Sequence, residues 1–520
     1  MQNIVKFRVK IDEAFLLILT FVYVYIPIVI FLVGWTKFYI SIPVSLMCMF
    51  AIYGFMREHQ KRQKTKAIKD VPIYFNLWIF IAVALMLLAF SYYMGWSGGA
   101  PQTNDWPKHN AIMRDLIQNE WPVYYYLGSR SMLTYYLGQY MVPALAGKMF
   151  GESFEAAQIA MLIWNFLGLW LIFTWISVVT RAVSIKRQMT CVLMLFFFGG
   201  MLPVAQILVT SWFEVGFLHE FDYFRFLNYD GLNLQYRSNI TDLRWVFQQC
   251  LVPWLTILVF LRYKDYRRHY LTMLLPNFLY AAITFIGAVI LAVSQAIVDL
   301  VRMQRQKLAG RWVKDIFSIY NIGLGVLLGG MLLLYYWGNV FSEKPEAMGF
   351  GIAIDRWDYL LVYLIFVLCM VGVHGFCIYR KYKRDPLYYI IMGMLILIPL
   401  FKMGIWNDWC MSVSICPLML LMVYILRYMF DERRNHAESF RMGILVSALC
   451  IGALYPIMET TQIVKADEIG EKQEYDWYHS MSQFASRYRD DIMDDLKYNY
   501  YSYDLEQNVF VNFIAKQKWD

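Results

Sequence analysis

Residues 96–126 read WSGGAPQTNDWPKHNAIMRDLIQNEWPVYYY, the first long polar break in a chain that is otherwise dominated by apolar runs. Pro107 favours the start of a short helix there, because proline is well tolerated in a first helical turn. Asp105, Lys108 and His109 then fall within one turn of each other. A carboxylate, a cation and an imidazole on one patch make this stretch the densest chemistry in the sequence.

The apolar runs around this break indicate the class of protein. The chain has 520 residues, of which 59% are hydrophobic and 18% aromatic, and its mean hydropathy is +0.43. Runs of about 20 apolar residues recur along most of it, which is the length a helix needs to cross a bilayer. The sequence therefore predicts an all-α, polytopic membrane protein and not a soluble domain.

Charge and cysteine usage fit the same class. The net charge of +8 does not indicate nucleic-acid binding, because the basic residues form short clusters between apolar runs, where they set orientation. The 8 cysteines lie within apolar runs and include no CxxC pair. They are interpreted as small buried hydrophobes and not as a zinc site or a disulfide framework.

The basic clusters predict how the chain is oriented. Residues 57–70, REHQKRQKTKAIKD, are so basic that they are expected in the cytoplasm, so that the next span delivers Asp105 to the outer face. The later clusters at 181–187 and 262–268 stay inside only if residues 131–150 do not cross. That segment is therefore expected to be a second juxtamembrane helix. Residues 271–301, with Pro276 and Gly287, predict a hairpin of two short half-spans.

This layout gives about 13 transmembrane segments in the cytoplasmic (inner) membrane, with the N-terminus inside and the C-terminus outside. Residues 1–459 form the expected transmembrane catalytic domain. It includes a first outer loop, 96–154, with juxtamembrane helices, and a second outer loop, 213–245. Residues 460–520 form an extracytoplasmic tail, for which two roles stay open: it covers the site, or it binds a partner.

Ionisable groups gather in the outer loops, whereas the centres of the expected spans are almost free of them. Pumps and ion-coupled transporters need such groups within the membrane. The pattern therefore favours an enzyme that acts on a lipid-borne substrate at the outer water interface. The alternative, for any one of these residues, is a charge that is simply solvated on a loop.

Three stretches carry a resemblance to a known family: NDWPKHNAIMRDL (104–116), LQYRSNITDLRWVFQQCLVPW (234–254) and NDWCMSVSICPLMLL (407–421). Together with the layout they resemble the polytopic GT-C class of glycosyltransferases, which includes aminoarabinose transferases and protein mannosyltransferases. Two departures are visible. The loop Asp of familiar members follows the first span, whereas more spans precede it here, and Ser412 and Cys416 replace an Arg and a Pro in the third stretch.

The resemblance implies an inverting glycosyltransferase of the cell envelope that contributes to glycan biosynthesis. It would transfer a sugar from a polyprenyl-phosphate-type lipid donor to a glycan, lipid or protein acceptor on the outer face. No nucleotide sugar is available there, so the donor must arrive on a lipid. Nucleic acid is not an expected partner. No cofactor is expected either, although a divalent metal stays open.

Asp105 is the expected general base, because a partly desolvated carboxylate has a raised pKa and takes a proton more readily. The alternative is a helix N-cap, since Asp is common just before a helix that starts with Pro. Lys108 and His109 are expected to bind the donor phosphate at the helix N-terminus. Their alternative is to snorkel toward lipid headgroups.

The second outer loop supplies the remaining candidates. Arg237 and Arg244 are expected to bind the donor phosphate, because a guanidinium grips phosphate with two donors. Glu220 and Asp222 are candidates for a second carboxylate that binds sugar hydroxyls, or for a metal site with His219 nearby.

Aromatic residues form a run of their own in the first outer loop. Tyr125 represents it as a sugar-stacking candidate. The members of the run are Trp121, Tyr124, Tyr125, Tyr126, Tyr135 and Tyr136. An interfacial aromatic belt explains the same pattern.

Two rival functions remain open from the sequence. One is a lipid-linked glycan polymerase or ligase, which has a similar number of spans and similar outer-loop chemistry. Its essential groups would be Arg and His and not Asp. The other is a lipid-glycan flippase or exporter, which needs a polar, charged path through the membrane. The spans with few charges argue against that second rival.

Overall fold

The structure is a computed structural model of the chain. It describes residues 8–68, 73–127, 129–213, 225–340, 349–404, 406–431, 436–468, 478–487, 500–502 and 505–517. Within these ranges, nine helices are long and apolar enough to cross a membrane, and Leu77–Tyr93 and Pro386–Leu400 are shorter apolar helices. The chain is thus an all-α, multi-pass membrane protein, as the apolar runs predict. The figure of about 13 segments stays a prediction.

The first three apolar runs form helices α1, α2 and α3. Helix α1 is Glu13–Trp35, and the Asp12 carboxylate caps it by accepting from the backbone N–H of Ala14 at 2.9 Å. Helix α2 is Phe38–Lys64, so it carries the basic stretch on its last turns. Strands β1 (Arg8–Ile11) and β2 (Ile73–Asn76) pair antiparallel and precede α1 and α3 (Leu77–Tyr93).

Four helices form the centre of the bundle, and every residue of α10 except Arg262 is buried there. They are α6 (Phe154–Thr180), α10 (Phe247–Tyr263), α13 (Ala282–Arg305) and α20 (Asp408–Met429). Helices α13 and α20 pack closely at Gly287, where an added Cβ would lie only 2.4 Å from the Val413 carbonyl oxygen. A glycine is therefore required there for the two backbones to approach.

This packing corrects the expected pair of short half-spans over 271–301. The first arm is short, as expected, and consists of α11 (Tyr270–Leu274) and α12 (Asn277–Tyr280), which are interrupted at Pro276. The second arm is instead a full helix of 24 residues, α13. Gly287 does not interrupt α13, because its role is the contact with α20.

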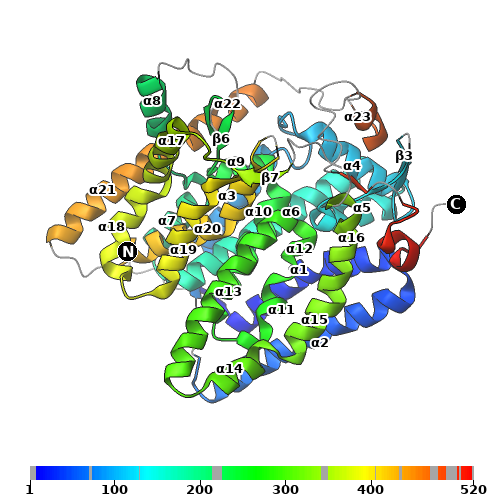
Figure 1. Ribbon diagram of the computed structural model, residues 1–520, viewed down its shortest axis with the longest axis horizontal. Coiled ribbons are helices and arrows are strands. Elements are labelled where there is room, and N and C mark those ends of the chain that lie inside the picture. The colour runs from blue at the N-terminus through cyan, green and yellow to red at the C-terminus, as the bar shows by residue number, and fades with distance from the viewer. Residues whose placement is uncertain are drawn as a thin grey trace.

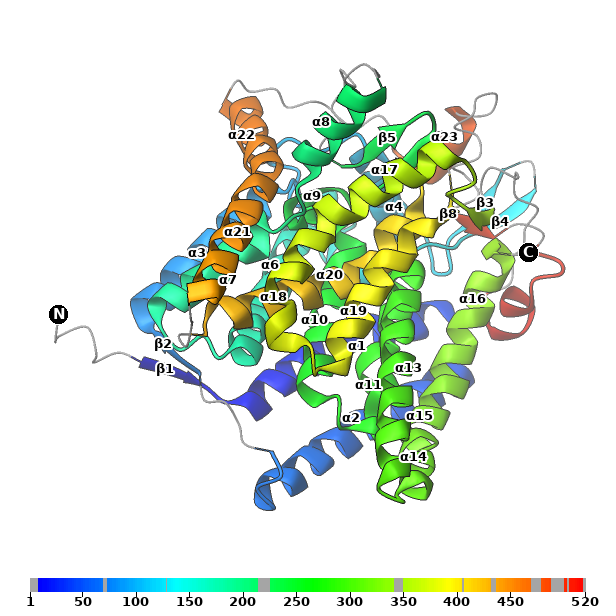
Figure 2. The same ribbon diagram turned by 60° about the vertical axis from the view of Figure 1, so that its left-hand side comes forward.

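The remaining helices surround this centre (Figures 1 and 2). They are α7 (Ile185–Phe197), α8 (Leu202–Phe213), α14 (Ala309–Ile316), α15 (Ile319–Leu324), α16 (Gly330–Val340), α17 (Trp357–Val367), α18 (Val373–Tyr382), α19 (Pro386–Leu397), α21 (His436–Gly452) and α22 (Leu454–Glu468).

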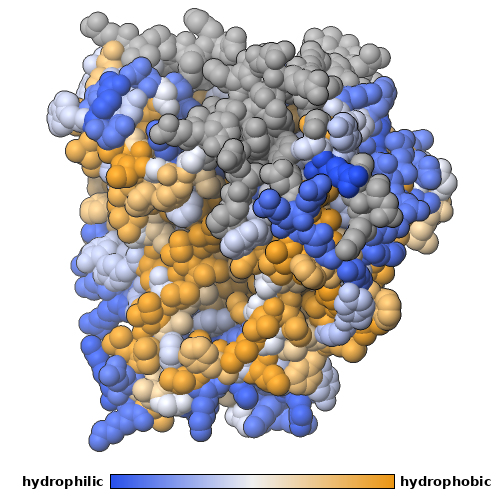
Figure 3. All heavy atoms as spheres, turned by 45° about the vertical axis from the view of Figure 1, so that its right-hand side comes forward, coloured by the Kyte–Doolittle hydropathy of each residue, from blue (hydrophilic) through white to orange (hydrophobic). Residues whose placement is uncertain are grey.

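The surface shows how the bundle meets its surroundings. Hydrophobic side chains form a broad band on the face drawn in Figure 3, and hydrophilic side chains border that band below. At the end of the bundle where α14 lies, buried carboxylates are paired with arginines. Arg262 Nε lies 2.6 Å from Glu13 Oε1, and Arg267 Nε lies 2.8 Å from Asp299 Oδ2. Such pairing suits charges at the edge of an apolar layer.

The first polar loop lies at the opposite end. Helix α4 is Trp106–Gln118, which confirms the short helix predicted from Pro107. Strands β3 (Tyr124–Tyr126) and β4 (Arg130–Leu133) follow, and then comes α5 (Met141–Met149). The nine residues of α5 span about 14 Å, too little to cross a bilayer, which agrees with the expectation that residues 131–150 do not cross.

The described residues 478–487, 500–502 and 505–517, here called the C-terminal segment, pack against this loop. Strand β9 (Tyr501–Ser502) pairs antiparallel with β4 and completes a three-stranded sheet in the order β3-β4-β9. Helix α23 (Met481–Arg487) packs against α4 at the same end of the molecule (Figures 1 and 2). A hairpin of β5 (Leu227–Tyr229) and β6 (Leu232–Leu234) also lies there, as does an antiparallel pair of strands distant in sequence, β7 (Phe350–Ile352) and β8 (Phe401–Met403).

Candidate functional site

A large cavity lies beside α4 and has a volume of about 1330 Å³. Its walls come from α4, the stretch 225–249, the first half of α13, the end of α16, the start of α20 and the C-terminal segment. All three stretches that carry the family resemblance contribute residues to it. Asp105, Arg237 and Asp408 represent one stretch each.

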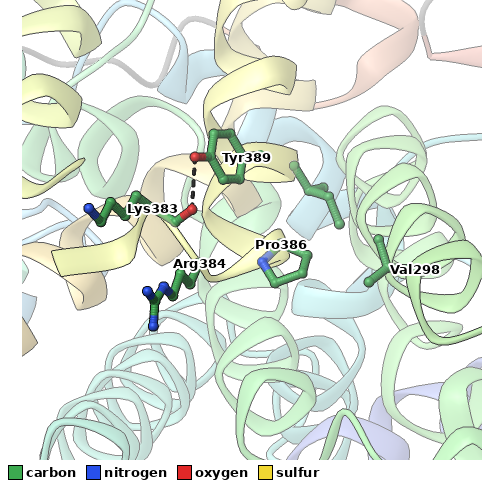
Figure 4. A pocket seen from close by; sticks show the side chains of 6 residues that line it. Val298, Lys383, Arg384, Pro386 and Tyr389 are labelled. Atoms are coloured by element: carbon green, nitrogen blue, oxygen red, sulfur yellow. Dashed lines mark hydrogen bonds between the residues drawn. The ribbon is translucent and has the colours of Figure 1, made fainter. Parts of the chain in front are cut away.

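A second, shallow depression lies near the other end of α13 and carries no comparable chemistry. It has a volume of about 420 Å³ and is lined by Val298, Lys383, Arg384, Pro386, Tyr389 and Ile390. Figure 4 shows Lys383 and Arg384 extending away from Val298, while the Tyr389 hydroxyl donates to the Lys383 carbonyl oxygen at 2.9 Å. Its charged groups do not converge, so the larger cavity is the candidate site.

Asp105 occupies the N-cap position of α4, but its side chain caps no backbone N–H of that helix. The carboxylate instead accepts from Lys108, whose Nζ lies 3.1 Å from Asp105 Oδ1. Both residues line the cavity, and the Asp105 side chain keeps 33% of its surface accessible. The capping alternative therefore describes the position of Asp105 in the helix but not the contacts of its carboxylate.

The expected rise in the pKa of Asp105 is wrong. Burial acts to raise this pKa, but the charges of Lys108, His109 and Arg225 together outweigh burial and lower it. Near pH 7 His109 is neutral, as shown below, so the cations that act there are Lys108 and Arg225. The pKa of Lys108 is raised, because the attraction of Asp105 and other nearby groups outweighs the opposite effect of burial.

His109 lies behind the cavity wall and is not one of its lining residues. Its ring is 2% exposed and packs against Trp106, Tyr140 and Phe247. The Nδ1 atom lies 2.5 Å from the Tyr140 hydroxyl oxygen. Burial, with the Lys108 charge, lowers the pKa of His109 to about 3. Its place and its neutral ring make His109 a support for α4, and its contact with phosphate stays a prediction.

Arg237 also lines the cavity, and its side chain is held by Gln235. Its Nε donates to Gln235 Oε1 at 3.0 Å, whereas its buried Nη1 has no hydrogen-bond partner among the residues that the structure describes. Burial and the nearby Arg225 lower the pKa of Arg237 to about 10, so it stays charged at neutral pH. Arg225 also lines the cavity, with its guanidinium 3.9 Å from the centre of the Trp245 ring. Sequence reasoning did not single out Arg225.

Arg244 is not brought into the cavity. Its Nη1 lies 3.6 Å from Glu459 Oε1 on α22, and Glu459 also accepts from Thr241 and Trp245. Asp242 lies beside this buried group. Burial raises the pKa of Asp242 to about 7. The charge of Glu459 also raises this pKa, whereas the charge of Arg237 lowers it. This cluster ties α22 to α9 (Asn239–Trp245) behind the cavity wall.

Asp408 is the second carboxylate of the cavity. It starts α20, next to Asn407, which has a left-handed backbone and caps the helix by accepting from the Cys410 N–H at 3.2 Å. The charge of Asp408 acts on both Lys108 and Arg237 and opposes the loss of their protons. Its signal in the sequence was the pair Asn407-Asp408 in the third stretch of the resemblance.

The other acidic candidates, Glu220 and Asp222, lie outside the described residues, as does His219. The metal alternative for them is therefore not tested. Within the described ranges, no group of three or more His, Cys, Asp or Glu side chains is arranged to hold a metal ion.

The aromatic run divides between two places. Tyr125 is buried away from the cavity, and its hydroxyl donates to Asp115 Oδ2 at 2.7 Å. Asp115 also accepts from the Met481 N–H at 2.8 Å, so Tyr125 helps to hold the C-terminal segment. Tyr135 and Tyr136, from the same run, do line the cavity. They are joined there by Tyr478, Phe484 and Tyr500 of the C-terminal segment, which sequence reasoning did not assign to the site.

The far end of the cavity is apolar and open. It is lined there by Phe278, Phe285, Ile286, Leu333 and Trp337, among others. Ile286 on α13, Leu333 and Trp337 on α16 are 40%, 50% and 45% exposed. The cavity therefore reaches the apolar outer surface of the bundle between α13 and α16, while its charged groups lie at the inner end.

The arrangement combines charged and apolar binding surfaces in one space. Two carboxylates and three cations converge at one end, and an apolar opening faces the surroundings of the bundle at the other. Comparisons of this chain with protein-family models, with curated proteins and with solved structures found no match.

Proposed function

We propose that the protein is a membrane glycosyltransferase that takes its sugar from a polyprenyl-phosphate-type lipid donor. One observation carries this proposal. The Asp105 carboxylate, which caps no backbone N–H of α4, lies in a cavity of about 1330 Å³ whose other end is apolar and opens on the side of the bundle. A substrate with a charged head and a long apolar chain fits both ends of such a space.

The donor would place its phosphate among Lys108, Arg225 and Arg237. Arg237 supports this assignment, because its buried Nη1 has no acceptor within the described ranges of the chain, and a buried donor in that state costs free energy until a ligand satisfies it. Guanidinium groups match phosphate oxygens well. The prenyl chain would leave between α13 and α16, past Ile286 and Leu333.

The chemical step is an inverting transfer. Asp105 takes the proton from an acceptor hydroxyl, the acceptor oxygen forms a bond to the anomeric carbon, and the bond from that carbon to the phosphate oxygen breaks. The phosphate leaves with the bonding electron pair, and the three cations stabilise its charge. Asp408 is placed to bind hydroxyls of the transferred sugar.

The lowered pKa of Asp105 describes the protein without donor. A donor phosphate would compete for Lys108 and bring negative charge close to the carboxylate. Both effects raise the pKa of a carboxyl group. Donor binding would thereby make Asp105 a stronger base when the reaction needs one.

The topology completes the proposal. We place the cavity on the outer side of the cytoplasmic membrane, with the N-terminus inside and the C-terminus outside, in a bundle of about 13 segments. A flippase is less well supported, because the residues of α13 that line the cavity end at Ile290 and leave the second half of that helix outside it. A polymerase or ligase would use the same cavity with Arg237 in the leading role and Asp105 dispensable.

The deciding experiment substitutes Asp105→Asn in the full chain. Membranes from cells that make each variant are analysed by mass spectrometry for polyprenyl-phosphate-linked sugars and for glycan products. A general base contributes about two to four orders of magnitude in rate. We therefore expect product to fall by that factor and the lipid-linked sugar to accumulate.

Asp355→Asn is the matched control, because Asp355 is an exposed carboxylate near β7 that does not line the cavity. It should leave both pools unchanged. Product formation by Asp105→Asn at the wild-type rate would refute the transferase proposal, and it would favour a flippase or a polymerase.

A further inference from the structure

One wall of the cavity is a continuous series of aromatic rings. It consists of Tyr336, Tyr136, Tyr135, Tyr500, Phe484 and Tyr478, all of which line the cavity, and we call it the aromatic wall. Centroids of successive rings lie 6.2, 5.0, 4.9, 5.6 and 5.4 Å apart in that order. The rings come from α16, from the first loop and from the C-terminal segment.

The wall meets the charged end of the cavity at Tyr500. Lys108 Nζ lies 5.8 Å from the centre of the Tyr500 ring, and Lys108 is the partner of Asp105. A ligand that lies on the wall would therefore reach the proposed base at one point along its length.

The part of the wall from the C-terminal segment is fixed in place by several contacts. The Thr134 N–H donates to the Tyr500 carbonyl oxygen at 2.8 Å, and the Tyr501 hydroxyl donates to the Met481 carbonyl oxygen at 2.6 Å. Asn339 Nδ2 donates to the Tyr501 carbonyl oxygen at 2.9 Å. The segment is thus held to both β4 and α16, and its rings form a preorganised surface.

Gln248 adds a polar group that faces the same space. It lines the cavity and is 1% exposed, and its Nε2 donates to the Tyr135 hydroxyl at 3.1 Å. Its Oε1 is buried and accepts no hydrogen bond from the part of the chain that the structure describes. A buried acceptor without a donor indicates a place for a ligand group that carries an O–H or N–H.

We propose that the aromatic wall is the acceptor subsite and that its ligand is a saccharide chain. This inference rests on the proposed function, and it selects a glycan or glycolipid over a polypeptide as the acceptor. The C–H groups of a sugar ring carry partial positive charge and lie well on the negative face of an aromatic ring. Five of the six rings are tyrosines, which have a hydroxyl as well as a face, and Gln248 Oε1 would accept from a sugar hydroxyl.

The apolar end of the cavity provides a contrast that supports this choice. Phe278, Ile286 and Leu333 carry no polar atoms in their side chains and suit a prenyl chain. The aromatic wall is more polar, because five of its rings carry hydroxyls; that of Tyr336 donates to the Leu279 carbonyl oxygen and that of Tyr135 accepts from Gln248. The two surfaces meet where the Phe278 ring stacks on the Tyr336 ring, with centroids 5.3 Å apart, and we assign the apolar one to the lipid and the aromatic wall to the saccharide.

The test measures saccharide binding by the purified full chain in detergent, by saturation-transfer NMR. The probes are cellotetraose, chitotetraose and maltotetraose, with a peptide rich in serine and threonine as the polypeptide probe. We expect at least one saccharide to bind, and Tyr500→Leu or Phe484→Leu to weaken it about fivefold to tenfold, the value of one aromatic contact. Tyr500→Phe should restore most of the affinity, because it keeps the ring.

Tyr126→Leu is the matched control, since Tyr126 belongs to the same loop, is 72% exposed and does not line the cavity. It should bind saccharide as the wild type does. Binding of the peptide but of no saccharide, no binding of any probe, or equal saccharide binding by Tyr500→Leu and the wild type would each overturn the inference.

A variant at the base separates the two proposals. Asp105→Asn should keep saccharide binding while it loses transfer. If saccharide binding depends on the wall but transfer survives Asp105→Asn, the proposed function fails and the subsite stands. If transfer needs Asp105 but the wall variants bind saccharide as the wild type does, the acceptor subsite is refuted and the proposed function is kept.

Discussion

Lys108 Nζ lies 3.1 Å from Asp105 Oδ1, and the two residues stand one turn apart at the start of α4. This pair joins the two halves of the proposed chemistry, because one partner would hold the leaving phosphate and the other would take the acceptor proton. While the pair is intact, Lys108 lowers the pKa of Asp105. Without donor, Asp105 is therefore a weak base, and a negatively charged donor would raise its pKa.

The first prediction concerns this pair. Lys108→Met removes the cation that binds the phosphate, so the KM for the lipid donor should rise by about tenfold or more, the effect of one charge-assisted contact. The kcat should fall less, because loss of Lys108 also raises the pKa of Asp105. Steady-state kinetics against donor concentration separate the two effects.

Lys402→Met is the control for this prediction, since Lys402 is an exposed cation on β8 that does not line the cavity. Its kinetics should match those of the wild type. An unchanged KM for the donor in Lys108→Met would exclude Lys108 from phosphate binding.

The second prediction compares the two arginines of the second loop. Arg237→Gln removes a guanidinium that faces the cavity, and should weaken donor binding by about tenfold to a hundredfold. Arg244→Gln breaks the contact with Glu459 at 3.6 Å and should lower thermal stability. Its donor affinity should stay within about twofold of the wild type. Isothermal titration with the lipid donor, alongside thermal unfolding, measures both.

Weaker donor binding by Arg244→Gln, together with wild-type donor binding by Arg237→Gln, would contradict the assignment of Arg237 to the donor phosphate. Arg237→Lys provides a further check. It keeps the charge but loses the fork geometry, so it should recover only part of the affinity.

The third prediction uses His109 and pH. Its pKa of about 3 lies below the ordinary value of about 6.5. The buried neutral ring therefore contributes stability that is fully present above about pH 6.5 and is lost as the pH falls toward 3. From pH 6.5 to pH 5 this one group should account for about 2 kcal/mol of the free energy of unfolding.

Thermal unfolding at pH 7.5 and pH 5 measures this effect. His109→Gln should lose less stability over that range than the wild type, by about the same 2 kcal/mol. His436→Gln replaces an exposed histidine on α21 and should keep the wild-type pH dependence. Equal pH dependence of His109→Gln and the wild type would contradict the burial of a neutral imidazole.

The fourth prediction concerns the attachment of the C-terminal segment. Asp115 accepts from the Tyr125 hydroxyl and from the Met481 N–H. Asp115→Ala leaves two buried donors without an acceptor, at a cost of about 1–3 kcal/mol for each. The segment should then be cleaved faster in limited proteolysis, and saccharide binding should weaken.

Asp115→Asn keeps one carbonyl oxygen at the same place and should lie between Asp115→Ala and the wild type. A segment that is equally protected in Asp115→Ala would show that β4 and α16 hold it without α4.

The sequence predicted much of the membrane architecture, because a membrane-spanning helix can be recognised from the hydropathy of one run of neighbouring residues. The boundaries of α1 and of α4 follow from a run of apolar residues and from Pro107. The interpretation of Gly287 failed for the opposite reason. A glycine in an apolar run looks like an interruption, and its actual role depends on Val413, which lies far along the chain on α20.

The site was predictable where its residues are neighbours in sequence. Asp105 and Lys108 stand one turn apart, so their pairing could be inferred from spacing. Asp408, Arg225 and Tyr500 reach the same cavity from distant stretches, and no local pattern marks that convergence. The pKa of Asp105 is lowered and not raised for the same reason, because it depends on how distant stretches place cations around a half-buried carboxylate.

The strand pair β4-β9 brings residues near the very end of the chain into the cavity. Every membrane helix that the structure describes precedes Tyr478 in the sequence. A chain cut after α22 would therefore keep those helices and the Asp105–Lys108 pair, yet lack three of the six rings of the aromatic wall, Tyr478, Phe484 and Tyr500. Such a cut would separate the assembly of the bundle from the binding surface on which we place the acceptor.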